Sequence, residues 1–134
     1  MAGSNNAPHR DMMRSPLGRA RGLGSARAGA AHWWAQRLTA VALVPLTLWF
    51  VCGVLRLHGA VQHDMVAWLS QPLPLVLMLA LIVATFHHLQ LGLQVVIEDY
   101  VHADGCRVAS ILALRAACVL LALACIISVL KLGL

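Results

Sequence analysis

Residues 73–97 read LPLVLMLALIVATFHHLQLGLQVVI, a long apolar stretch without Asp, Glu, Lys or Arg. Its length and composition are typical of a helix that crosses a lipid bilayer. Pro72 comes just before the stretch, and proline is well tolerated in the first turn of a helix. Glu98 and Asp99 follow directly and mark a polar end. We therefore predict a membrane-spanning helix over residues 73–97.

A second apolar stretch precedes this one and predicts another span over about residues 38–57. Its uncharged part lies between Arg37 and Arg56, whose long side chains can extend their charges to the membrane surface. Trp33 and Trp34 come just before it, where indole rings commonly sit at the interface between lipid and water.

A third apolar stretch predicts a span over about residues 108–130, after the turn signal of Asp104 and Gly105. Arg115 lies in its first half, so this charge must extend to the interface or be buried against a partner. The mixed segment between the first two spans reads as a loop with a short interfacial helix.

The overall composition agrees with a protein whose solvent is lipid. Of the 134 residues, 60% are hydrophobic and 11% are charged, and the mean hydropathy is +0.80. A soluble domain of this size has too small a core to bury so many apolar residues. These values exclude a soluble enzyme, a secreted disulfide scaffold and a disordered tail, and they indicate an all-α integral membrane protein with three spans.

The net charge of +5 is confined to the N-terminal segment, where six arginines up to Arg37 face only Asp11. Positive charge beside a membrane span marks the cytoplasmic side, which is a better interpretation than nucleic-acid binding. We expect residues 1–31 to form a flexible basic arm and residues 32–134 to form the membrane domain. The arm favours a bacterial inner (cytoplasmic) membrane protein with a cytoplasmic N-terminus. A mitochondrial transit peptide, and hence the mitochondrial inner membrane, is the alternative.

The four cysteines do not suggest a disulfide framework or a cysteine-held metal. They are Cys52, Cys106, Cys118 and Cys125, and they form no CxxC motif. Three of them lie within apolar runs, where a thiol packs as a small hydrophobic group.

The polar side chains with most chemical interest are His87 and His88, inside the central span. A histidine within the bilayer is costly unless it has a partner, so it is a candidate for function. On a helical wheel, the small residues Ala84, Thr85 and Gly92 lie one turn above or below His88. This clearance suits a flat macrocycle coordinated through Nε2, although small residues also mark helix contacts. His87 points ~100° away, towards a neighbouring helix or a partner subunit.

Asp99 and Tyr100 lie at the cytoplasmic end of the same helix, about 16 Å beyond His88. A phenol beside a carboxylate at the membrane surface can hydrogen-bond a quinone carbonyl and supply protons. The alternative is an interfacial tyrosine and an acidic helix end. No second histidine is well placed within the bilayer, so a second axial ligand to a haem would come from another subunit.

These motifs together resemble a known family. A glycine follows His88 after four residues, and Asp-Tyr follows it after eleven and twelve. This spacing resembles the hydrophobic membrane anchor, the D-type subunit, of succinate dehydrogenase (respiratory complex II). The segment Arg37-Leu-Thr-Ala resembles the entry to the first helix of that family, and the resemblance covers about residues 32–134.

The resemblance implies roles for four residues. His88 would be an axial ligand to the iron of haem b, and Arg37 would meet a haem propionate. Tyr100 would hydrogen-bond ubiquinone, with Asp99 near it. The second axial histidine would come from a C-type cytochrome b anchor, which packs with this chain into a haem-binding helical bundle.

The resemblance also implies partners and a role in metabolism. FAD would be held by a flavoprotein subunit and iron–sulfur clusters by an iron–sulfur subunit, both docked on the membrane anchor. The chain would contribute to the tricarboxylic acid cycle and aerobic electron transport, in contact with lipid and not with nucleic acid, without catalysing a reaction alone. The alternatives are the anchor of a fumarate reductase and a small structural or assembly membrane protein without cofactor.

Overall fold

Four helices make up the part of the chain that this computed structural model describes, residues 27–133. They are α2 (Arg27–Arg56), α3 (Gln62–Leu69), α4 (Pro72–Tyr100) and α5 (Asp104–Gly133), and no strand occurs among the described residues. Three of them, α2, α4 and α5, are long and apolar enough to cross a membrane. The prediction of an all-α membrane protein with three spans is therefore confirmed, and α3 is the short helix expected between the first two.

All three long helices extend beyond the predicted spans. Helix α2 begins at Arg27, so residues 27–31, which the sequence assigned to the arm, are helical. Helix α4 continues to Tyr100, and α5 begins at Asp104. The sequence pattern locates the uncharged part of each helix, whereas the backbone hydrogen bonds continue into the polar interface. The rest of the predicted arm, residues 1–26, lies outside the described residues.

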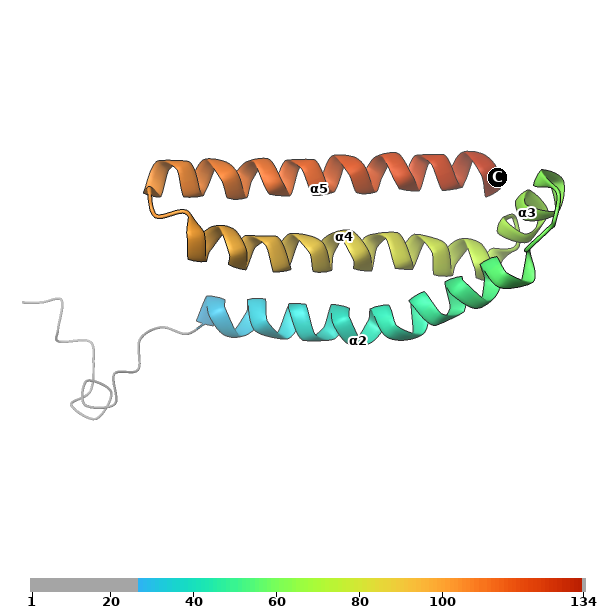
Figure 1. Ribbon diagram of the computed structural model, residues 1–134, viewed down its shortest axis with the longest axis horizontal. Coiled ribbons are helices and arrows are strands. Elements are labelled where there is room, and N and C mark those ends of the chain that lie inside the picture. Colours follow the sequence, from blue (N-terminus) through green and yellow to red (C-terminus); the bar gives the residue numbers. More distant parts are fainter. Residues whose placement is uncertain (1–26, 134) are drawn as a thin grey trace, which may run out of the picture. The chain divides into compact units, whose positions relative to one another are not determined.

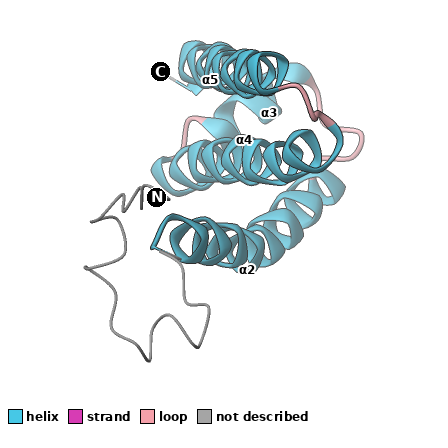
Figure 2. Cartoon of the chain, turned by 90° about the vertical axis from the view of Figure 1, so that its left-hand side faces the viewer, coloured by secondary structure: helices cyan, strands magenta, loops and turns pink. Residues whose placement is uncertain are grey.

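The chain divides into two compact units, residues 1–31 and 32–134, and the packing that follows is that of the second unit. Helix α4 lies between α2 and α5 in both views (Figures 1 and 2). Helices α4 and α5 make the most extensive contact, and their well-buried apolar side chains include Leu91 at 6% and Cys118 at 5% exposure. Most large apolar side chains face outwards, as expected where lipid or another subunit covers the surface.

Helix α2 curves in its second half, beyond Pro45 (Figure 1). A proline inside a helix removes one backbone hydrogen bond and commonly bends it. The curved end of α2 carries Trp49 and Gly53, and Trp68 of α3 packs there, with its ring stacked on Trp49 at 5.5 Å between centroids. This contact joins α3 to α2 at the end of the bundle opposite to Tyr100.

Candidate functional site

Helix α4 turns His88 towards α2, where the imidazole meets a threonine. The distance between Oγ1 of Thr39 and Nδ1 of His88 is 3.0 Å. No described residue bonds the other ring nitrogen, Nε2, and it is not among the buried polar atoms that lack a partner. Nε2 therefore reaches the surface of this unit and can accept a ligand from outside it.

Two more α2 side chains continue this contact towards the Tyr100 end of α4. Gln36 lies one turn from Thr39, and its Nε2 is 4.0 Å from where a Cβ on Gly92 would stand. His32 shares the same face of α2, seven residues before Thr39, and its Nε2 is buried with no partner among the described residues. We call His32, Gln36, Thr39, His88 and Gly92 the α2–α4 seam. Gly92 faces Gln36 across a loose contact, so both roles that the sequence left open for it, clearance for a macrocycle and helix packing, remain open.

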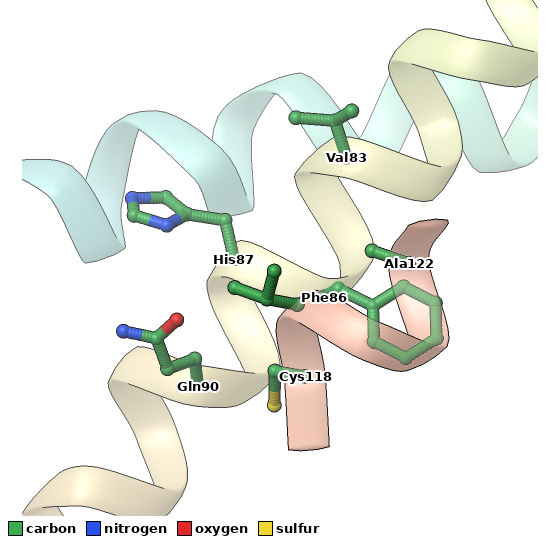
Figure 3. Close-up of a pocket in the computed structure, with 7 residues that line it drawn as sticks. Val83, Phe86, His87, Gln90, Cys118 and Ala122 are labelled. Atoms are coloured by element: carbon green, nitrogen blue, oxygen red, sulfur yellow. The ribbon is translucent and has the colours of Figure 1, made fainter. Parts of the chain in front are cut away.

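His87 leaves α4 in a different direction from its neighbour. It lines a hollow on the surface shared by α4 and α5 (Figure 3), where the other lining residues are Val83, Phe86, Gln90, Cys118, Val119 and Ala122. Its side chain is exposed and hydrogen-bonds no described residue. The two adjacent histidines thus serve separate surfaces, as the helical wheel predicted.

Arg37 lies outside the α2–α4 seam and contacts Trp33 instead. Its guanidinium carbon lies 5.1 Å from the ring centroid of Trp33, a cation–π contact. Arg37 is two positions before Thr39, which corresponds to a rotation of about 200° around α2. Its side chain therefore leaves the helix on the side opposite to His88. Along the helix axis, however, the two positions differ by only about 3 Å. Among the described residues no carboxylate pairs with this guanidinium.

Asp99 and Tyr100 are the last two residues of α4. Because α4 is unbroken from His88 onwards, they lie about 16–18 Å along its axis from His88, at the polar end of the helix. Tyr100 is 78% exposed, and Asp99 is also exposed. Both side chains are therefore open to a ligand or partner at the membrane surface, and they do not contact His88.

A separate polar chain of contacts joins α5 to α4. Nη2 of Arg115 donates to Oε1 of Gln94 at 3.2 Å, and Nε2 of Gln94 donates to Oε1 of Glu98 at 2.8 Å. The sequence left two alternatives for Arg115, extension to the interface or burial against a partner; in the structure its side chain is exposed and contacts Gln94 on the adjacent helix. The contact gives this guanidinium an oxygen acceptor near the polar end of the bundle.

The donor set suits one axial position of a haem and no more. An axial histidine binds iron through a neutral ring nitrogen, and His88 offers such an atom at Nε2 while its Nδ1 is already engaged. Between residues 27 and 133 no three His, Cys, Asp or Glu side chains gather to hold a metal ion.

Sequence reasoning did not single out Thr39 or the buried nitrogen of His32. A signal for Thr39 was present, because it is one of two threonines in an otherwise apolar part of α2, and a polar side chain within a span commonly bonds to a neighbouring helix. The sequence alone does not say which helix that is.

The chain is similar in sequence to known membrane subunits of one enzyme family. Residues 11–122 match the family described as succinate dehydrogenase/fumarate reductase transmembrane subunit. The chain is 33% identical over 116 residues to a succinate dehydrogenase hydrophobic membrane anchor subunit of Rickettsia bellii, covering 87% of this chain and 93% of the relative. It is 35% identical over 98 residues to the subunit of that name from Paracoccus denitrificans, covering 73% and 75%. No solved structure matches the chain significantly.

Proposed function

The chain belongs to the succinate dehydrogenase/fumarate reductase transmembrane subunit family, as an anchor subunit of succinate dehydrogenase, and we propose that it supplies one axial ligand of haem b and part of a quinone site. The observation that carries the haem proposal is the state of His88, whose Nδ1 is engaged while Nε2 is open. Because the chain belongs to this family, the alternative of a small structural or assembly protein is set aside. The relatives described above are named for succinate dehydrogenase, which favours that enzyme over a fumarate reductase.

In this proposal the α2–α4 seam forms one wall of a haem site. His88 would hold the iron through Nε2, and a histidine of a C-type cytochrome b anchor would supply the second ligand. A bound haem b would accept and release single electrons. Arg37 would neutralise a propionate, for which its guanidinium must leave Trp33 and turn towards the seam. Its depth, within about 3 Å of Thr39 along α2, supports this role.

The quinone site lies at the exposed end of α4. The phenol of Tyr100 would donate a hydrogen bond to a ubiquinone carbonyl, and the carboxylate of Asp99 beside it would accept and pass on protons during reduction. Both side chains are free of competing contacts within the described residues, and their exposure leaves room for a ligand. The electrons would come from FAD in a flavoprotein subunit through the clusters of an iron–sulfur subunit, which docks at this end.

The arrangement in the membrane follows from charge. The arginines of the N-terminal segment keep that end in the cytoplasm of a bacterial cell, with the protein in the inner membrane. Helices α2 and α4 run in opposite directions, so the end of α4 that carries Tyr100 lies on the same side as Arg37. That is the side on which soluble partner subunits would dock.

The test compares the two adjacent histidines in the assembled complex, purified through a tag on this chain. We expect His88→Ala to remove the low-spin b-type bands from the reduced-minus-oxidised visible spectrum, while succinate oxidation by soluble dyes persists. His87→Ala is the matched control and should keep those bands, because His87 faces the α4–α5 surface. Unchanged haem spectra in His88→Ala would disprove the ligand assignment, and a wild-type complex that lacks the b-type bands would disprove haem binding altogether.

A further inference from the structure

The groups around His88 decide which of its ring nitrogens carries the proton. Oγ1 of Thr39 lies 2.9 Å from the carbonyl oxygen of Ala35 and 3.0 Å from that of Gln36. The same oxygen lies 3.0 Å from Nδ1 of His88. A hydroxyl has one proton to donate, and carbonyl oxygens only accept. The Thr39 proton is therefore directed at the backbone of α2, as is common for a threonine within a helix.

This geometry leaves only lone pairs of Oγ1 facing the imidazole. The contact is then a hydrogen bond only if Nδ1 of His88 is the donor. If Nδ1 had no proton, Thr39 would have to turn its own proton away from two carbonyl oxygens that lie about 3 Å away. A neutral imidazole carries a single N–H, so protonation of Nδ1 places the free lone pair on Nε2.

We propose that Thr39 is a positioning residue for His88: its hydroxyl oxygen accepts the Nδ1 proton, sets the tautomer and holds the ring so that Nε2 faces the iron. This inference rests on the proposed function, in which His88 is an axial ligand. An acceptor on the far nitrogen of a metal-bound histidine makes that ligand more basic and restrains its orientation. Thr39 suits the task because two contacts to the α2 backbone hold its oxygen in place.

The surroundings strengthen the argument. Both side chains are partly buried between α2 and α4, two of the helices that are long and apolar enough to cross a membrane. Water is scarce there, so an N–H without a partner is costly. Thr47 provides a natural comparison, because this second threonine of α2 is exposed and lies beside Leu43, Val44 and Leu48. No described residue of another helix hydrogen-bonds its side chain.

The experiment uses the assembled complex with Thr39→Val, which keeps the shape of the side chain and removes the hydroxyl. Loss of the acceptor makes His88 a weaker donor to ferric iron, so the haem reduction potential should rise. A tenfold change in the preference for ferric over ferrous iron corresponds to about 59 mV. Haem affinity should fall about 10- to 100-fold, the range found when such partners are removed elsewhere. The electron paramagnetic resonance signal of the low-spin ferric haem should also move.

Two further variants separate this role from helix packing. Thr39→Ser keeps a hydroxyl and should restore both the potential and the resonance signal. Thr47→Val, the same change elsewhere on α2, should leave both at their wild-type values. If the valine variant does not assemble, Thr39→Ala makes the same comparison without a branched side chain.

The possible outcomes have distinct meanings. A wild-type potential and resonance signal in assembled Thr39→Val or Thr39→Ala would overturn the inference and leave the proposed function standing. Failure of both variants to assemble, with Thr39→Ser intact, would assign the hydrogen bond to helix packing and also overturn it. Retention of haem in His88→Ala would instead overturn the proposed function itself.

Discussion

Replacing Gly53 by alanine tests how α3 is held against α2. A Cβ at this position would lie 2.9 Å from Cζ2 and 3.1 Å from Cη2 of Trp68. The indole cannot easily move away, because it also stacks on Trp49. Excess volume in a packed site costs about 1–3 kcal/mol. Alanine recovers up to about 1 kcal/mol of helix propensity. We therefore expect a net loss of stability of about 1–2 kcal/mol, within limits of about 0 and 3 kcal/mol.

The assay is the midpoint of thermal denaturation of the assembled complex in detergent, which should fall in Gly53→Ala. Gly105→Ala is the control, because no atom lies within 4 Å of a Cβ added at Gly105 of α5. Trp68→Phe removes the two carbon atoms that meet the new methyl group, so in that background Gly53→Ala should cost little. A Gly53→Ala complex more stable than the wild type, or the same cost of Gly53→Ala in the Trp68→Phe background as in the wild type, would refute the reasoning.

Two other predictions concern the polar end of the bundle. Tyr100→Phe removes only the phenol oxygen, so it should lower the rate of quinone reduction more than the rate of dye reduction by succinate; equal effects on both rates would contradict a quinone role. Gln94→Leu removes the acceptor of Arg115 and leaves that charge unpaired near the bilayer, which should cost about 1–3 kcal/mol. Arg115→Leu removes the charge itself and should lower the thermal midpoint less; the reverse order would contradict the expectation that the unpaired charge is the main cost.

The positions of the helices were largely predictable because the signals for them are local. A stretch such as residues 73–97 must be helical in lipid, since only a helix or a closed barrel satisfies its backbone groups. The predicted ends were short by a few residues at α4 and α5, because helix continues past the last apolar side chain into the interface. At α2 the helix begins at Arg27, well before the uncharged segment.

The candidate site was only partly predictable. The sequence singled out His88 because burying a histidine in lipid is costly. The helical wheel predicted that His88 and His87 point in different directions. The sequence did not pair His88 with Thr39, because these residues are 49 positions apart and belong to different helices. The family resemblance implied a haem propionate as the partner of Arg37, which stays a prediction, and the contact of this side chain with Trp33 was not foreseen.

The sequence by itself determined that this chain is a membrane protein, where its helices lie, and which polar groups enter the bilayer. The tertiary structure alone decided which helix each of those groups faces: α2 for His88, the α4–α5 surface for His87, and α4 for Arg115. The physical reason is that lipid solvates every apolar face of a helix equally well. No one-sided pattern of apolar residues then marks the contact face, and only the packing of the helices against one another selects the partners.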